Sequence, residues 1–195
     1  MRKAKIDRKT SETDICLSLN LDGLGQARIN TGIGFFDHML TQIAVHGLID
    51  LDLQAKGDLQ IDAHHTIEDC GLVLGEAIAQ ALGEKRGITR MAEASVPMDD
   101  ALARVVLDLS GRPYSLFRTK WVSASVGGLP VSLLEHFFES LAITSRMNLH
   151  IHVLYGKDNH HMAEALFKAF ARALDGAIQI DPRRADLIPS SKGQL

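Results

Sequence analysis

Apolar and polar residues alternate along the chain with two different periods. Residues 34–44 and 132–142 place apolar side chains three and four positions apart, which is the spacing of a helix with one buried face. The side chains expected on these faces are Phe36, Met39, Leu40 and Ile43 in the first segment and Leu134, Phe137, Phe138 and Leu141 in the second. The two segments are therefore predicted to be amphipathic helices.

Segments with a period of two precede and follow each of these helices. LIDLDLQA, from Leu48, and MNLHIHVLYG, from Met147, alternate apolar and polar residues as half-buried strands do. SETDICLSLNLDG and DDALARVVLDLSGRP show the same alternation ahead of the helices, and the turns between strands are expected at Gly23, Gly25, Gly111 and Pro113. Each helix is thus predicted to lie between strands.

The second half of the chain repeats the first. GFFDHMLTQIA, from Gly34, matches SLLEHFFESLA, from Ser132, at an offset of 98, and the segments from His64 and His160 match at an offset of 96. We predict an α+β fold of two units, each a sheet with two helices on one face, with the helices of the two halves packed between the sheets. One domain, 1–195, would contain repeats of about 1–86 and about 87–180 and a polar tail, 181–195, that is loop or mobile end.

Composition narrows the classes of function. The 195 residues carry a formal net charge of −3 and no run of lysines or arginines, which argues against a nucleic-acid or anionic-membrane surface and favours a small-molecule partner. No segment approaches the roughly 20 apolar residues of a membrane span, and the polar start is unlike a signal peptide, so we expect a cytoplasmic location. Cys16 and Cys70 are too few for a disulfide framework and are predicted to be buried thiols.

The histidines are the unusual feature, because a pair of adjacent histidines one turn before a glutamate occurs twice. On a helix, His64, His65 and Glu68 span an arc of about 100° and can face one cavity. Successive side chains diverge by about 100°, so two nearby ions suit the adjacent histidines better than one. The motif therefore predicts a site for two metal ions.

The second copy and one histidine from each of the other helices complete the candidate ligands. These six imidazoles and two carboxylates are His38, His64, His65, Glu68, His136, His160, His161 and Glu164. Four nitrogen or oxygen ligands per ion leave positions for water or substrate on an octahedral ion, which favours manganese over zinc, with iron possible. Open coordination positions indicate catalysis.

Other polar residues are less informative on their own. His46, His150 and His152 have no duplicated partner and are expected on strand faces or in loops, and Asp69 is expected to be a solvated helix acid. Asp37 and Glu135, next to the lone histidines, either cap or orient them or have no role. A phosphate site is compatible with Arg90, Arg112, Ser190, Ser191 and Lys192, although each alone, like Glu12, is typical of a solvated surface.

GIGFFDHML, DAHHTIEDCG, SGRPY and NLHIHVLYGKDNHHMAEALFKAFARAL resemble the motifs of the imidazoleglycerol-phosphate dehydratases of histidine biosynthesis, and the resemblance covers nearly the whole chain. It implies a duplicated half-unit of a four-stranded sheet and two helices, similar to the second domain of ribosomal protein S5. It also implies a homo-oligomer, a 24-mer, with two manganese ions between subunits. The chain has no additional phosphatase segment, so the resemblance implies a monofunctional enzyme.

By the same resemblance, the eight candidate ligands bind the metals, Glu12 lies in the substrate site, and Arg90, Arg112, Ser190, Ser191 and Lys192 bind the substrate, chiefly its phosphate. The implied reaction is loss of water from D-erythro-imidazole glycerol phosphate to give imidazole acetol phosphate. Metals at both ring nitrogens would make the ring an imidazolate, which expels a hydroxyl and gives a diazafulvene-like intermediate before the enol and ketone. We expect Glu12 to transfer the proton, with His64, Glu68, His160 and Glu164 acting as catalytic metal ligands.

Two other classes of protein fit the same histidines. A two-metal hydrolase would use them to activate water and would release inorganic phosphate instead of forming a ketone. A metal-storage protein or a metal-structured assembly would also contain many histidines, but it would not need a phosphate site beside the metals.

Overall fold

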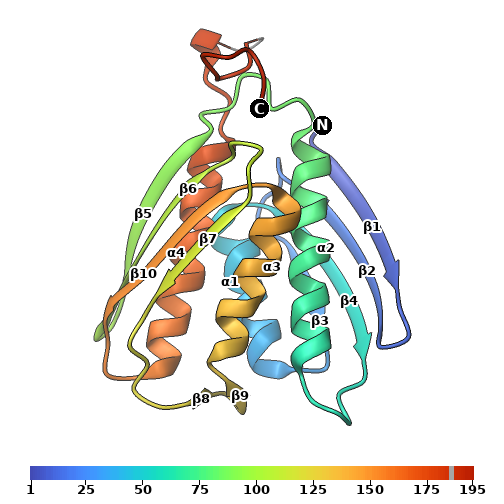
Figure 1. Ribbon diagram of the computed structural model, residues 1–195, viewed down its shortest axis with the longest axis vertical. Coiled ribbons are helices and arrows are strands. Elements are labelled where there is room, and N and C mark those ends of the chain that lie inside the picture. The colour runs from blue at the N-terminus through green and yellow to red at the C-terminus, as the bar shows by residue number, and fades with distance from the viewer. Residues whose placement is uncertain (185–186) are drawn as a thin grey trace.

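The computed structural model describes residues 1–184 and 187–195. Within them, four helices lie between two four-stranded sheets, which form the two flanks of the molecule (Figure 1). The helices are α1 (Gly34–Gly47), α2 (His64–Leu82), α3 (Ser132–Ser145) and α4 (Asn159–Ile178). The predicted α+β class, with helices packed between sheets, is confirmed.

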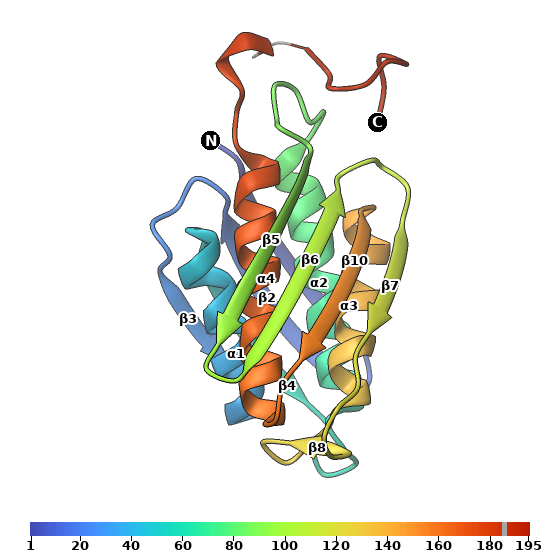
Figure 2. The ribbon, with the colours of Figure 1, turned by 90° about the vertical axis from the view of Figure 1, so that its left-hand side faces the viewer.

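The two sheets have equivalent strand orders. The first runs β1-β2-β4-β3, with β1 (Lys3–Lys9), β2 (Thr13–Asn20), β4 (Asp50–Gly57) and β3 (Ala27–Asn30). The second, which faces the viewer in Figure 2, runs β5-β6-β10-β7, with β5 (Met91–Met98), β6 (Ala101–Asp108), β10 (Asn148–Tyr155) and β7 (Tyr114–Arg118). In both, the last strand is parallel to its neighbour and the other pairs are antiparallel. This equivalence confirms the duplicated half-unit.

Two short elements add to the second half and its tail. The strands β8 (Ser125–Val126) and β9 (Leu129–Pro130) form a small antiparallel hairpin just before α3. A 3₁₀ turn, η1 (Pro182–Arg184), follows α4. The hairpin lies at the same end of the molecule as the start of α3 (Figure 1).

One hydrophobic core joins the halves, because α1 packs against α4 and α2 against α3. All eight apolar positions predicted for the first helices are fully buried. The ring of Phe36 in α1 meets that of Phe137 in α3 edge to face, with centroids 5.3 Å apart, and burial of such side chains contributes about 1.5–3 kcal/mol each. None of the helices in residues 1–184 and 187–195 is long and apolar enough to cross a membrane.

Two glycines allow α2 and α3 to approach closely. A Cβ atom at Gly75 would lie 2.4 Å from the carbonyl oxygen of Leu141, and one at Gly71 would lie 2.7 Å from that of Phe137. A larger side chain would force the helices apart and cost about 1–3 kcal/mol. The close contact fixes the position of His136, which lies on α3 just before Phe137.

Three local predictions are corrected by the structure. The strand expected from Leu48 begins at Asp50, because Leu48 has a left-handed backbone (φ 52°) that ends α1. Cys16 is exposed on the outer face of β2, since its neighbours Ile15 and Leu17 occupy the inner face, whereas Cys70 is buried as expected. His46 lies in the last turn of α1, while His150 and His152 are on a strand face as predicted.

Candidate metal centre and substrate site

The candidate metal ligands lie in the first two turns of the four helices, whose N-termini are at one end of the molecule, the lower end in Figure 1. Aspartates fix the start of the two helices that carry the histidine pairs. The side chain of Asp158 accepts hydrogen bonds from the backbone N–H groups of His160 and His161, and Asp62 accepts one from His64. Such bonds satisfy backbone donors that are otherwise free at a helix start. We call this region the metal end.

The first cluster consists of His38, His160 and Glu164, and it joins α1 to α4. The Nε2 atoms of His38 and His160 lie 3.2 and 3.4 Å from Oε2 of Glu164. Lys168, one turn further along α4, contacts the other carboxylate oxygen at 2.6 Å. Burial raises the pKa of Glu164, but hydrogen bonds from Lys168 and His38 outweigh it, so the pKa is lower than usual and the carboxylate form is favoured.

The second cluster consists of His64, Glu68 and His136, and it joins α2 to α3. Nε2 of His64 lies 3.7 Å from Oε2 of Glu68, and Nε2 of His136 lies 3.6 Å from Oε1. The rings of His64 and His136 are stacked with centroids 4.7 Å apart. In each cluster, one half of the chain supplies a glutamate and the histidine one turn before it. The other half supplies the second histidine.

The donor set and its geometry fit a divalent metal ion. In each cluster the three donor atoms lie within 4.8 Å of one another. Donors about 2.1 Å from an octahedral ion stand about 3 Å apart, so small side-chain movements would bring these atoms around one ion. The buried Nε2 of His136 has no hydrogen-bond partner among the described residues, which is costly for a polar atom unless a ligand satisfies it.

The other two candidate ligands, His65 and His161, are outside both three-member clusters. Nδ1 of His65 is hydrogen-bonded to Asp58 at 3.0 Å, and Nδ1 of His161 to Asp100 at 2.6 Å. These hydrogen bonds raise the pKa of both imidazoles. Of the eight candidate ligands, the structure thus brings six together in two groups of three and leaves two apart.

Glu12 lies at the metal end, in the turn between β1 and β2. Its Oε1 is 3.7 Å from Nε2 of His65, and its side chain is half exposed. The neighbouring Thr13 donates a short hydrogen bond to Asp69 of α2, which also accepts one from Arg8 of β1 at 3.0 Å. Asp69 is buried, so its prediction as a solvated acid was wrong, and it anchors the turn that carries Glu12.

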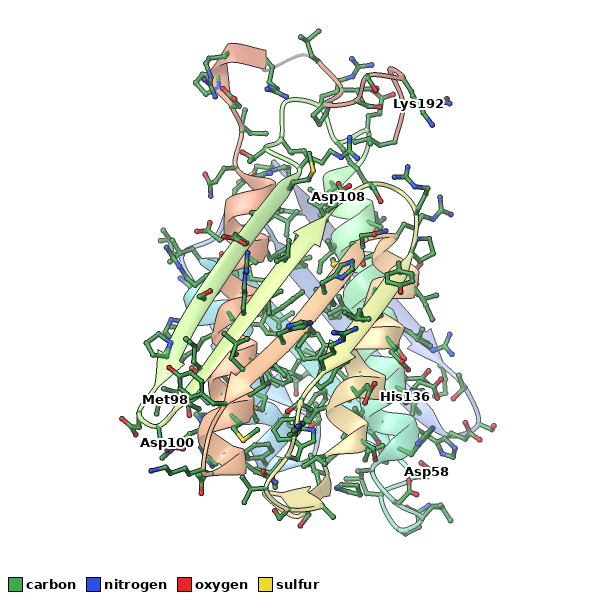
Figure 3. All side chains as sticks on the ribbon, turned by 60° about the vertical axis from the view of Figure 1, so that its left-hand side comes forward. Asp58, Met98, Asp100, Asp108, His136 and Lys192 are labelled. Carbon is green, nitrogen blue, oxygen red and sulfur yellow. The ribbon has the colours of Figure 1, made fainter. Side chains whose placement is uncertain are left out.

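The predicted phosphate-binding residues lie at the opposite end of the molecule. Figure 3 shows Lys192 at the upper end, with Asp58 and His136 at the lower end. Arg90 donates two hydrogen bonds to Asp108, at 2.7 and 2.9 Å, and one to the carbonyl oxygen of Pro189 at 2.8 Å. A guanidinium has five N–H donors, and these bonds to Asp108 and Pro189 use three of those of Arg90. Arg90 therefore fixes the tail, and in the described part of the chain two of its donors remain for a ligand.

The tail is held in place around Arg90. Gly87 N–H donates to the carbonyl oxygen of Leu187, and Lys192 N–H donates to the Ser190 hydroxyl. A cavity of about 420 Å³ is lined by Arg90, Arg184, Ser190 and Ser191 together with nearby apolar residues. Arg112 is exposed in the loop after β6, where the final residue, Leu195, packs against Gly111. We call this region the tail end.

Several residues that shape the site were not identified from the sequence. Asp58, Asp100 and Asp108 each bond a candidate functional side chain, but none of them belongs to a duplicated motif. Asp37 accepts hydrogen bonds from Thr31 and so fixes the loop before α1 instead of orienting His38. Burial and the charge of Glu139 raise the pKa of Glu135, which bonds no candidate ligand in the described part of the chain.

Comparisons with a family model and with related sequences identify the same family. The family model described as imidazoleglycerol-phosphate dehydratase matches residues 31–174. The chain is 56% identical over 194 residues to the imidazoleglycerol-phosphate dehydratase of Dehalococcoides mccartyi (strain CBDB1), covering 100% of this chain and 97% of the relative. It is 52% identical over 195 residues to that of Cereibacter sphaeroides (strain KD131), covering both chains completely.

Two solved structures are also similar. The imidazoleglycerol-phosphate dehydratase of Staphylococcus aureus subsp. aureus N315 superposes with a TM-score of 0.83 at 36% identity, covering 92% of this chain and 99% of that chain. The enzyme from Pyrococcus furiosus, solved in complex with (S)-C348, gives a TM-score of 0.84 at 38% identity, covering 97% of this chain and all of that one.

Proposed function

The chain belongs to the imidazoleglycerol-phosphate dehydratase family and has its dehydratase activity in histidine biosynthesis, and we propose that two divalent ions, most suitably manganese, are held at the metal end. The reaction is the removal of water from D-erythro-imidazole glycerol phosphate to give imidazole acetol phosphate. The observation that carries the proposal is the duplicated arrangement in which two histidine Nε2 atoms point at one glutamate. Each cluster would hold one ion. We expect the enzyme to be cytoplasmic.

The geometry supports completion of each ion's ligands by another copy of the chain. One chain supplies three donors per cluster, while the Nδ1 atoms of His65 and His161 are bonded to aspartates that belong to neither cluster. We propose that these two histidines are donated to the clusters of neighbouring copies. That arrangement gives four protein ligands per ion and requires a homo-oligomer, for which the family resemblance implies a 24-mer.

The chain's own residues would bind the substrate at both of its ends. The divalent ions that the two clusters would hold would lower the pKa of the substrate's imidazole, so that the ring could supply electrons for the elimination. Glu12 would accept the carbon-bound proton at its carboxylate, for which its place beside His65 is suitable. Arg90, Arg112, Ser190, Ser191 and Lys192 of another copy would hold the phosphate and fix the ring between the two clusters.

Metal depletion tests this proposal. Treatment with a chelator should abolish formation of the ketone product, and added Mn²⁺ should restore it. Turnover that is unchanged in metal-free protein would exclude the two-ion site. Release of inorganic phosphate without ketone would instead indicate the alternative, a two-metal hydrolase.

A further inference from the structure

We propose that Asp58 and Asp100 are positioning residues that aim Nε2 of His65 and His161 outward, toward metal ions bound to neighbouring copies of the chain. The inference rests on the proposed ligand role of these two histidines. It assigns a function to two carboxylates that belong to neither cluster.

The contacts of the two aspartates are specific. Oδ2 of Asp58 accepts a hydrogen bond from Nδ1 of His65 at 3.0 Å, and Oδ1 of Asp100 accepts one from Nδ1 of His161 at 2.6 Å. The second oxygen of Asp100 accepts a short hydrogen bond from the backbone N–H of Lys157, so its orientation is also fixed. In both cases the aspartate bonds Nδ1 of the ring and does not bond Nε2.

The duplication does not explain this match, because the two aspartates come from non-equivalent places. Asp58 lies between β4 and α2, whereas Asp100 lies in the turn between β5 and β6. The β1–β2 turn of the first half carries Glu12, 3.7 Å from Nε2 of His65, and the β5–β6 turn of the second half carries Asp99, 3.6 Å from Nε2 of His161. The first turn carries no counterpart of Asp100 that bonds Nδ1 of His65 among the described residues, and Asp58 takes that place. Two unrelated loops therefore deliver a carboxylate to the same atom of equivalent histidines.

The lengths of the linkers give the structural reason. Six residues separate β4 from α2, but only Gly156, Lys157 and Asp158 separate β10 from α4. In the shorter linker, Asp158 already caps α4 through the N–H groups of His160 and His161. No position remains there for an equivalent of Asp58, and the second half obtains its acceptor from the β5–β6 turn.

The histidines inside the clusters differ in this respect. In residues 1–184 and 187–195, Nδ1 of His38 is 3.4 Å from the side-chain amide of Gln42, which is neutral. Nδ1 of His136 is 3.9 Å from the carboxylate of Glu139, and this distance is too long for a hydrogen bond. Their Nε2 atoms are already directed by a glutamate of the same chain. His65 and His161 have no glutamate of a cluster to direct them, and the aspartates take that role.

A hydrogen bond at Nδ1 determines what the imidazole can do at Nε2. An imidazole that donates its Nδ1–H to a carboxylate has its lone pair on Nε2, the form that binds a metal ion. The carboxylate also makes the ring a stronger donor and limits its rotation. Loss of such a partner typically lowers metal affinity by about 10–100-fold.

The test uses the full-length protein and Mn²⁺ alone. Mn²⁺ affinity is measured by competition with a chelator in the wild type, Asp58→Ala, Asp58→Asn, Asp100→Ala and Asp100→Asn. We expect the alanine variants to bind about 10–100-fold more weakly, and the asparagine variants to fall between them and the wild type because the amide oxygen still accepts from Nδ1–H. Asp52→Ala, on the outer face of β4, is the control and should bind as the wild type does.

Two further measurements separate the explanations. The rise in Tm on adding Mn²⁺ should be smaller in the alanine variants than in the control, and the metal-free Tm of Asp100→Ala should also fall because the bond to Lys157 is lost. A lower metal-free Tm with normal Mn²⁺ affinity would show a structural role alone and overturn the inference. His161→Asn should lose more affinity than Asp100→Ala. Wild-type affinity in Asp100→Ala but not in His161→Asn would reject this inference alone, whereas wild-type affinity in His161→Asn would reject the proposed ligand set.

Discussion

The two ends of the molecule differ in how completely one chain builds them. At the metal end, two clusters of three donors are already assembled around Glu68 and Glu164. At the tail end, Arg90 and the loops around it present cationic and hydroxyl groups, and none of the eight candidate metal ligands lies there. A single chain therefore carries both sets of candidate residues but separates them by the length of its helices. This comparison supports the proposal that one catalytic site takes its two ends from different copies.

The two clusters also differ from each other, although the repeat relates them. The side chain of Glu164 is only 11% exposed and is bonded to Lys168, whereas that of Glu68 is 37% exposed and has contacts of 3.6–3.7 Å. The first cluster is thus more fixed before metal binds. Duplication has preserved the donor types and the direction of the side chains, while the surroundings of each cluster have diverged.

The largest effect is expected at the metal end. Glu164→Gln removes the charged ligand of the first cluster, and the loss of metal-based stabilisation, several kcal/mol, should reduce kcat by about 10³-fold. The measurement is steady-state turnover together with the metal content of the purified protein. Glu76→Gln, an exposed glutamate on α2, is the matched control and should remain within about twofold of the wild type. Normal turnover in Glu164→Gln would separate the first cluster from the chemistry.

A smaller loss is expected at Glu12, which would transfer a proton but bind no metal. Glu12→Gln should reduce kcat by about 10²-fold or more, because loss of a general acid or base costs that much. Metal content and KM should stay close to those of the wild type, which distinguishes this variant from Glu164→Gln. Near-normal turnover would mean that another group moves the proton.

Substitutions at the tail end should weaken substrate binding more than they reduce turnover. Lys192→Met removes one charge-assisted contact to phosphate, about 1.5–3 kcal/mol, so KM should rise roughly 10–100-fold with a smaller change in kcat. Lys3→Met, on the outer face of the first sheet, is the control for lost charge. A kcat effect as large as that of Glu164→Gln, with KM unchanged, would contradict the division of roles between the ends.

The sequence predicted those parts of the structure that periodicity and duplication encode. The buried helix faces of Phe36 and Phe137 follow from a spacing of three and four residues. Of the eight candidate ligands chosen from the duplicated segments, six gather in the two clusters. The edge strand β3 has only four residues, half-buried in alternation, and its parallel pairing depends on contacts distant in sequence. No pattern of so few residues specifies such a pairing.

Residues that act through tertiary contacts were beyond the reach of sequence patterns. In the sequence, Asp69 is a charged residue of a predicted helix and was expected to be exposed. It is buried, and Arg8 and Thr13 on the neighbouring strands donate hydrogen bonds to it. Asp58 and Asp100 were missed because different loops supply them. The separation of Lys192 from the histidines is also a property of the folded chain, since it depends on the direction of all four helices.

The most direct test of the central claim combines two defective variants in one assembly. Glu164→Gln affects only the metal end, and the double variant Arg112→Ala, Lys192→Ala affects only the tail end, so each alone should have little activity. Coexpression in equal amounts should restore about one quarter of the wild-type activity, because random mixing gives that fraction of sites two intact ends from different copies. Mixed assemblies of normal mass and metal content that stay as inactive as their parents would show that each site uses both ends of one chain, and would contradict the account.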